Sequence, residues 1–198
     1  MAETGNKLNS PATIKLYLNQ TDVVWEKLQN EGVVFSKLDY IRKKYQEAAP
    51  IFVTIYSWFV GQASSIVSRP VGAEFPYWAQ RELVNLDTSG SGHVFVVEVP
   101  LDEVVLFDYK EWTKILQFKY LAESEDDEKI FDKELAAQGV DEYKVLTTSF
   151  YPMLKQKILK SWERLFRHDA EIKAGASEVK SVSAALWCIK KDWIVEEL

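Results

Sequence analysis

The segment HVFVVEV at residues 93–99 carries one carboxylate within an apolar strand pattern. Because side chains alternate between the two faces of a strand, Glu98 is predicted to share a face with Val94 and Val96. A carboxylate held beside apolar residues is the kind of group that serves acid–base chemistry. Glu98 is therefore a candidate catalytic residue, and the alternative is a solvent-exposed charge on an edge strand.

A second polar position follows the first predicted strand, TIKLYL at residues 13–18. Asn19 and Gln20 end that strand, and Thr21 or Asp22 can accept hydrogen bonds from the free N–H groups of the next helix. The two amides either line a ligand site or lie in a turn that leads into the helix. On the first interpretation, Gln20 is the second candidate catalytic residue.

Aromatic side chains gather beside polar ones in two further places. Tyr56 shares a predicted helix with Gln62, and Arg69 follows that helix, whereas Tyr77 and Trp78 lie in a segment too irregular for plain core. Flat rings beside amides and an arginine are suited to a purine or a nicotinamide with its pyrophosphate, although each ring alone also fits a core position. The candidate cofactor-binding residues are Tyr17, Tyr56, Gln62, Arg69, Tyr77 and Trp78.

Composition excludes several other kinds of site. The chain of 198 residues has two histidines and one cysteine, Cys188, so neither an intrachain disulfide nor a cysteine-built metal site is possible, and no metal is expected. The Gly-rich nucleotide loops and the G-x-S-x-G elbow are absent. A net charge of −6 disfavours broad nucleic-acid binding, although a basic helix face at residues 155–167 remains a possible surface for RNA or an acidic partner.

Hydrophobic periodicity predicts the elements that would position these residues. Short strands are expected at residues 13–18, 93–99, 104–107, 182–189 and 193–195, with an edge strand or loop at 75–83. Helices are expected at residues 22–31, 36–47, 50–67, 109–120, 127–138 and 152–168. Asp108 and Glu111 form a capping-box pattern before one of these helices. The prediction is a single α+β domain over residues 13–198, with a mixed or antiparallel sheet of about five strands wrapped by about six helices.

The chain has no stretch that approaches about 18 uninterrupted apolar residues, and its start lacks the apolar core of a signal peptide. Residues 1–12 are therefore expected to be a flexible lead-in. The absence of a membrane segment and the single cysteine together favour a cytoplasmic protein.

Six short motifs in order resemble a bacterial family known as domain-of-unknown-function family 3841. They are Leu16-Tyr17-x-x-Gln20, Tyr56-x-Trp58 with Gln62, Phe75-Pro76-x-Trp78, Glu98-Val99-Pro100 followed by Leu106-x-Asp108 and Trp112, Ser161-Trp162-Glu163-Arg164-x-Phe166, and Leu186-Trp187-x-Ile189. The resemblance runs from about Ile14 to the C-terminus. It implies a domain boundary but no activity. Glutamine usually stands in this family where the chain has Ser183, so the resemblance also implies that a site using that amide is altered here.

The layout of the first strand, turn and helix is also similar to the start of the ADP-ribosyltransferase fold. That similarity implies that Gln20 contacts the nicotinamide ribose of NAD, that Tyr56 or Tyr77 stacks on the nicotinamide and that Glu98 polarises the reacting centre.

Two functions therefore remain open. One is an NAD-consuming, ADP-ribosyltransferase-like enzyme that stabilises an oxocarbenium-like state with Gln20 and Glu98. The other is a non-catalytic module whose aromatic side chains bind a small molecule or a protein partner. The two differ in one geometric requirement, because the enzyme needs Gln20, Tyr77 and Glu98 in a single pocket.

Overall fold

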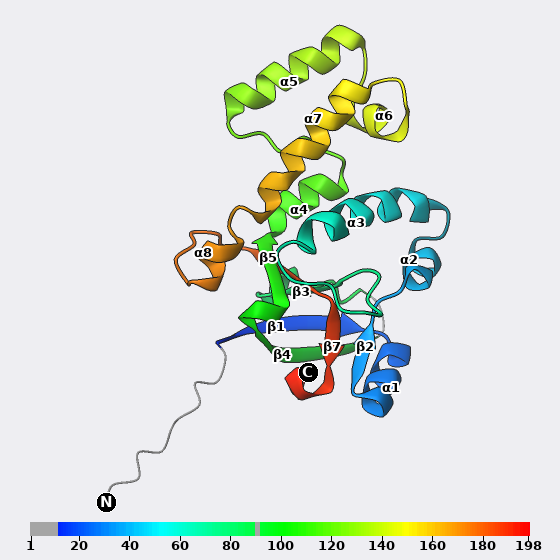
Figure 1. The fold of residues 1–198 in the computed structure, drawn as a ribbon, viewed down its shortest axis with the longest axis vertical. Coiled ribbons are helices and arrows are strands. Elements are labelled where there is room, and N and C mark those ends of the chain that lie inside the picture. The colour runs from blue at the N-terminus through cyan, green and yellow to red at the C-terminus, as the bar shows by residue number, and fades with distance from the viewer. Residues whose placement is uncertain (1–11, 90–91) are drawn as a thin grey trace, which may run out of the picture.

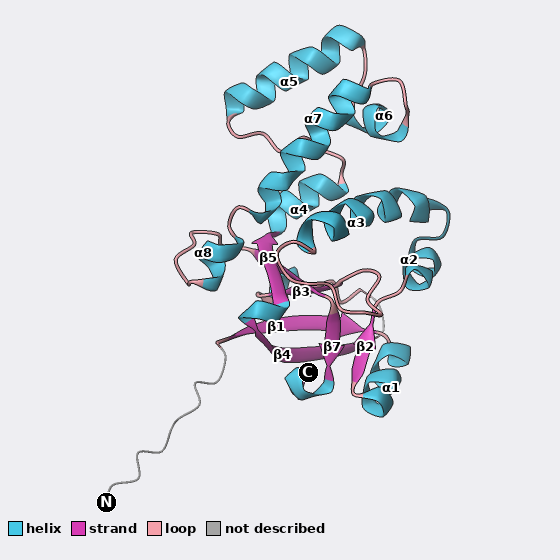
Figure 2. Ribbon diagram, in the orientation of Figure 1, coloured by secondary structure: helices cyan, strands magenta, loops and turns pink. Residues whose placement is uncertain are grey.

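Six antiparallel strands form the central sheet of the computed structural model, which describes residues 12–89 and 92–198 (Figure 2). The order of the strands across the sheet is β5-β6-β3-β1-β4-β8. Their bounds are β1 Thr13–Gln20, β3 Tyr77–Gln80, β4 His93–Pro100, β5 Val104–Asp108, β6 Val182–Leu186 and β8 Ile194–Glu197. The expected lead-in over residues 1–12 lies outside the described residues except for Ala12.

A two-stranded antiparallel ribbon packs beside this sheet. It pairs β2, Val33–Phe35, with β7, Cys188–Lys190. The predicted strand 182–189 is thus two strands, β6 and β7, which belong to different sheets and are separated at Trp187. At this junction the Trp187 side chain is buried, and its indole N–H donates to the Val67 carbonyl at 2.9 Å.

The helices complete an α+β fold, as predicted, around a sheet slightly larger than expected. Six of the eight α-helices in the described residues are eight residues or longer. Their bounds are α1 Asp22–Glu31, α2 Leu38–Tyr45, α3 Ala49–Ala63, α4 Tyr109–Leu116, α5 Glu125–Gln138, α6 Glu142–Thr147, α7 Pro152–Trp162 and α8 Asp169–Lys173. No helix among the described residues is long and apolar enough to cross a bilayer.

Each face of the sheet has its own buried core. On the face that we call the α3 face, Val105 and Phe107 pack under α3, α4 and α7. On the other, the α1 face, Leu16 and Leu18 pack under α1 and the β2–β7 ribbon. Figure 1 shows α5 and α6 lying beyond α4, away from the sheet. This helical extension consists of α5, α6 and the N-terminal half of α7.

The β-rich runs at residues 93–99 and 182–189 predict that Val94, Val96, Leu186 and Trp187 are buried in the sheet, and this prediction is mostly confirmed. Val96, Leu186 and Trp187 are buried, whereas Val94 is half-buried. The expectation that residues 75–83 form an edge strand or loop was wrong, because β3 pairs with both β6 and β1. Pro76 precedes the first residue of β3, so its missing N–H does not interrupt the ladder.

The structure changes the end of one predicted helix and confirms only the Asp108 half of the capping-box pattern of another. The helix expected over 152–168 ends at Trp162 and continues as a 3-10 turn, Glu163–Phe166. Asp108 does cap α4, because its carboxylate accepts from the Lys110 N–H at 2.7 Å. Glu111 forms an ion pair with Arg167, and burial raises the pKa of its carboxyl.

His93 joins three elements at one end of the sheet. Its Nδ1 lies 2.5 Å from Oε1 of Glu197 on β8, and its Nε2 lies 3.2 Å from Oδ1 of Asp22 on α1. The hydrogen bond to Glu197 is the main cause that raises the pKa of His93, and the charge of Asp22 adds to it. Protonated His93 therefore holds the C-terminal strand and the start of α1 together.

This arrangement predicts a pH-dependent contribution to stability. The pKa of His93 is raised in the folded protein above its unfolded value of about 6.5, so the contribution is complete below about pH 6.5 and is lost as pH rises through the folded-state pKa. Melting temperatures of the wild type and His93→Gln, measured from about pH 5 to about pH 9, should converge as the pH rises. A constant difference between the two across this range would contradict the prediction.

Candidate functional site

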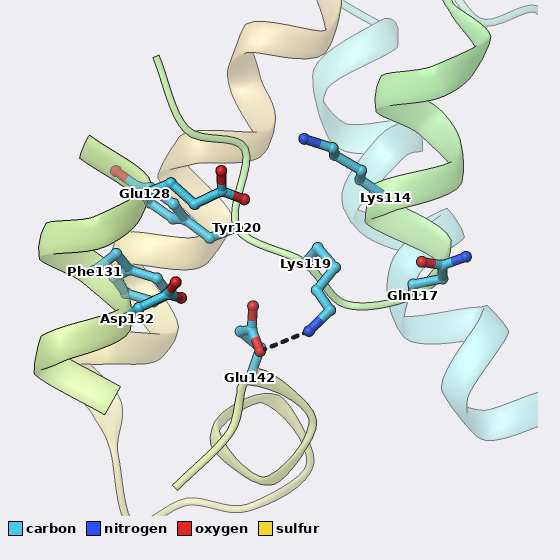
Figure 3. Close-up of a pocket in the computed structure, with 8 residues that line it drawn as sticks. All are labelled: Lys114, Gln117, Lys119, Tyr120, Glu128, Phe131, Asp132 and Glu142. Atoms are coloured by element: carbon cyan, nitrogen blue, oxygen red, sulfur yellow. Dashed lines mark hydrogen bonds and ion pairs between the residues drawn. The ribbon is translucent and has the colours of Figure 1, made fainter. Parts of the chain in front are cut away.

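A cavity of about 320 Å³ lies between α4, α5 and α6 (Figure 3). Lys114 of α4 and Gln117, the C-cap residue that follows this helix, form one wall, and residues of α5 form the opposite wall. The segment between α4 and α5 contributes Lys119 and Tyr120. The complete lining is Lys114, Gln117, Lys119, Tyr120, Glu128, Phe131, Asp132 and Glu142.

The end of α4 sets the direction of the segment that lines the cavity. The Lys119 N–H donates to the Lys114 carbonyl and the Phe118 N–H to the Ile115 carbonyl, both at 2.9 Å, which is the Schellman pattern. This motif needs a left-handed residue, and Phe118 takes that position with φ +64°. The strained backbone conformation of Phe118 is tolerated because its ring is buried and packs edge-on against Tyr143 of α6, with ring centroids 5.6 Å apart.

Strain at Phe118 predicts an unusual order of stability for two variants. Phe118→Ala and Phe118→Gly both lose the ring contact with Tyr143, but only glycine adopts φ +64° without a Cβ penalty. Phe118→Gly should therefore be more stable than Phe118→Ala by about 1 kcal/mol, as measured by urea denaturation. Equal stability, or a more stable alanine variant, would show that the left-handed backbone is not strained.

The segment after Phe118 is fixed to α7 through its backbone. The Trp162 indole N–H donates to the Lys119 carbonyl at 2.8 Å, and the Leu121 N–H donates to the Ser161 hydroxyl at 3.0 Å. Arg164 adds a hydrogen bond to the Leu121 carbonyl. With their backbone held against α7, the Lys119 and Tyr120 side chains line the cavity.

The N-terminal half of α5 forms the acidic wall. Ser124 caps this helix by accepting from the Asp127 N–H at 3.2 Å. The Tyr120 hydroxyl donates to Asp127, and its ring stacks on Phe131 with centroids 4.2 Å apart. Glu128 and Asp132, one helical turn apart, carry the carboxylates of this wall, and both point into the cavity in Figure 3.

The floor of the cavity is an ion pair between two elements. Oε2 of Glu142, the first residue of α6, lies 3.1 Å from Nζ of Lys119. The Glu142 side chain is only 12% exposed. This pair holds α6 against the segment that carries Tyr120, so it contributes more to the shape of the cavity than to its free charge.

The remaining charges face each other across the cavity without partners. Among the residues that the structure describes, Lys114, Glu128 and Asp132 have no oppositely charged group within 4.0 Å. In Figure 3, Lys114 points from the α4 wall toward the α5 wall. The cavity can therefore accept a ligand that carries charges of both signs.

A second cavity, of about 520 Å³, lies on the α7 side of Tyr120. Its cationic side chains are mostly engaged already, since Lys157 pairs with Glu134 at 2.8 Å and Arg164 with Glu123 at 2.8 Å. The cavity between α4, α5 and α6, here called the α4–α5 cleft, is therefore the stronger candidate site.

The structure does not bring the two candidate catalytic residues together. Gln20 is paired with His93, whereas Glu98 is paired with Lys15, five positions along the same two strands. At about 3.3 Å per residue this separates them by about 17 Å. By strand alternation, Gln20 shares the α1 face with Leu16 and Leu18, and Glu98 lies exposed on the α3 face.

Tyr77 and Trp78 also lie on opposite faces of the sheet. Tyr77 belongs to the core on the α1 face, where burial raises the pKa of its phenol, and Trp78 packs against the core on the α3 face. The expectation that these two rings line one site was therefore wrong. Neighbouring strand residues alternate in direction, and a ligand on one face cannot contact both rings.

Tyr56 is buried in an aromatic cluster on the α3 face. Its hydroxyl lies 2.9 Å from that of Tyr45, and its ring lies 5.2 Å from Trp78 and 6.1 Å from Trp112. Burial is the main reason that the pKa of Tyr56 is raised. Tyr56 and Trp78 thus do meet, but as part of the core.

The other predicted ligand-binding residues are dispersed. Tyr17 is half-buried on β1, under Lys15, whose Nζ lies 5.5 Å from the ring centroid. Gln62 is half-buried near the end of α3, and Arg69 is exposed in the loop that follows. Ser183 is buried and donates to Oε1 of Gln80 at 2.8 Å, so its hydroxyl bonds within the sheet.

The Asn19 side chain and the Gln20 backbone mark a close approach between β1 and the loop before β4. The Asn19 side chain donates to the Asp87 carbonyl at 2.9 Å. A Cβ on Gly92 would lie 2.6 Å from the Gln20 carbonyl oxygen and 2.7 Å from Asn19 Oδ1. Thr21 is the N-cap of α1, although its side chain makes no capping hydrogen bond. The junction thus serves as a packed turn.

Sequence reasoning missed the α4–α5 cleft because it placed Glu128 and Asp132 on a predicted helix at residues 127–138 without identifying the elements that face them. One signal was present in the sequence, since Glu128 and Asp132 place like charges four residues apart on a helix. Within residues 12–89 and 92–198, no group of three or more His, Cys, Asp or Glu side chains is placed to hold a metal ion.

Comparison with known proteins finds one family over nearly the whole chain. Residues 15–195 match the family described as "Domain of unknown function (DUF3841)". No curated protein and no solved structure matches the chain. Because the match covers far more than half of the sequence, the chain belongs to the DUF3841 family.

Proposed function

We propose that this protein is a non-catalytic module that binds a small polar ligand in the α4–α5 cleft. The observation that carries the proposal is the set of unpaired charges on facing walls, Lys114 on one side and Glu128 with Asp132 on the other. The volume of about 320 Å³ is near the lower limit for ligand pockets, about 300 Å³, so it suits a metabolite rather than a dinucleotide.

Binding is favoured over catalysis because of the chemistry of the lining. No lining residue is a serine, cysteine or histidine. Glu128 and Asp132 are exposed, whereas a carboxylate that serves as a general acid or base usually lies in a buried site or beside a close charge. The side chains of the cleft are suited to hold a charged molecule in place.

An ADP-ribosyltransferase-like activity would require Gln20, a tyrosine and Glu98 around one nicotinamide ribose. Gln20 and Glu98 are separated along β1 and β4 and face opposite sides of the sheet. NAD would therefore have no site in which both residues contact the reacting bond. The geometry supports the binding module as the better of the two functions.

A thermal-shift screen tests this proposal directly. Free amino acids, polyamines and nucleotides, including NAD, would be added to the wild type, to Lys114→Glu and to the control Lys110→Glu. Lys110 is exposed on the same helix but does not line the cleft. At least one charged metabolite should raise the melting temperature of the wild type and the control but not of Lys114→Glu. NAD consumption that Glu98→Gln abolishes would overturn the proposal.

A further inference from the structure

The unpaired charges of the α4–α5 cleft specify the charge pattern of a complementary ligand. The Lys119–Glu142 pair is internally neutral, which leaves one cation, Lys114, and two carboxylates, Glu128 and Asp132. A ligand that matches them carries one anionic group and two cationic groups. The anion must face α4 and the cations must face α5.

The acidic wall contains a repulsion that a cation would relieve. Glu128 and Asp132 lie at positions i and i+4 of α5, where like charges repel each other and destabilise a helix. The nearby basic residue Lys129 pairs instead with Glu125 and Asp126, at 3.9 Å and 3.5 Å. The two cleft carboxylates therefore have no counter-ion on their own helix.

The two carboxylates favour a guanidinium as one of the cationic groups. Tyr120 and Phe131 stack on each other beside these carboxylates and are only 7% and 1% exposed, so they close the wall and present no free ring face to a ligand. A guanidinium binds a carboxylate through several N–H groups in one plane, whereas an ammonium acts as a point charge.

We infer that the ligand is a free basic α-amino acid, with L-arginine as the best-matched member. This inference rests on the proposed function. Its α-carboxylate pairs with Lys114, and its guanidinium and α-ammonium pair with the two α5 carboxylates. A terminal arginine of a peptide shares much of this chemistry. A C-terminal arginine lacks the α-ammonium, however, and an N-terminal one lacks the carboxylate, so only the free amino acid supplies all three charges.

Isothermal titration with matched probes tests this assignment. The probes are L-arginine, agmatine without the carboxylate, N-acetyl-L-arginine without the α-ammonium, L-arginine amide and the neutral analogue L-citrulline. Each would be titrated into the wild type, Lys114→Gln, Asp132→Asn and the controls Lys110→Gln and Asp126→Asn. Neither control residue lines the cleft.

L-Arginine should bind the wild type and both controls about tenfold more tightly than any of the other probes, which corresponds to about 1.4 kcal/mol per lost ion pair. Lys114→Gln should bind L-arginine as weakly as the wild type binds agmatine, and its affinity for agmatine should be unchanged. Asp132→Asn should weaken the binding of L-arginine and the binding of agmatine by a similar factor.

Three outcomes would overturn the inference, and they differ in what they say about the site. Tighter binding of N-acetyl-L-arginine or L-arginine amide than of L-arginine would assign the cleft to a peptide terminus. No binding of L-arginine, with another metabolite still sensitive to Lys114→Glu, would reject the ligand class but retain the binding module. Insensitivity of every ligand to Lys114 and Asp132 would reject the proposed function as well.

Discussion

Replacing Trp187 by alanine should lower the free energy of unfolding by about 3–5 kcal/mol. Trp187 is 4% exposed and lies where the chain passes from β6 to β7, so it supports the central sheet and the ribbon together. Its indole N–H also donates to the Val67 carbonyl after α3, and alanine would leave that carbonyl without this donor.

Chemical denaturation of Trp187→Ala and Trp187→Phe would separate the two contributions. Phenylalanine fills most of the volume but cannot donate to Val67, so it should cost about 1–2 kcal/mol from the lost hydrogen bond and imperfect packing. A loss below about 1 kcal/mol for Trp187→Ala would mean that the junction of the two sheets does not depend on this side chain.

Replacing Asp169 by alanine should cost about 3 kcal/mol, since it removes one partner of a largely buried ion pair. Oδ1 of Asp169 accepts from the Leu106 N–H of the edge strand β5 at 2.7 Å, and Oδ2 lies 2.8 Å from Nζ of Lys173. The two side chains are only 11% and 19% exposed. Alanine would leave both Leu106 and Lys173 without this acceptor.

Asp169→Asn is the matched control, because its amide oxygen can still accept from Leu106 while the charge opposite Lys173 is gone. In urea denaturation of both variants, Asp169→Asn should lose about half as much free energy of unfolding as Asp169→Ala. Equal losses for the two variants would show that the ion pair with Lys173, and not the bond to the β5 edge, holds α8 in place.

Alternation and turn residues were sufficient to predict the long strands. The sequence predicted strands at 93–99 and 104–107, and β4 and β5 extend only one residue further at their ends. Strong β-forming residues lie between a glycine-rich loop and a proline turn there, so local preference and burial agree. The helix predicted at 127–138 was found at Glu125–Gln138, beginning two residues earlier because Ser124 caps it.

Long-range pairing could not be read from local pattern. The position of β3 between β6 and β1, and the register that places Lys15 opposite Glu98, depend on contacts between distant segments. The sequence gives the alternation within each strand, but the face on which Gln20 lies relative to Glu98 follows only from that register. The proposed site of Gln20, Tyr77 and Glu98 failed as a single pocket for this reason.

The α4–α5 cleft was hidden for a related reason. Its lining comes from two helices, one connecting segment and the start of α6, and the left-handed turn at Phe118 sets the direction of that segment. A phenylalanine in this conformation is not expected from backbone preference, since glycine usually fills the position. Contacts of the ring with α6 stabilise the turn, and these contacts exist only in the folded protein.

Amide chemical-shift mapping tests the central claim most directly. The ¹⁵N-labelled protein would be titrated with the metabolite that stabilises it most, and separately with NAD. Our account predicts that the metabolite shifts amides around the α4–α5 cleft, at Lys119, Tyr120, Glu128 and Asp132, and leaves those of Gln20 and Glu98 unchanged. Saturable NAD-induced shifts at Gln20 and Glu98, with no ligand response in the cleft, would contradict it.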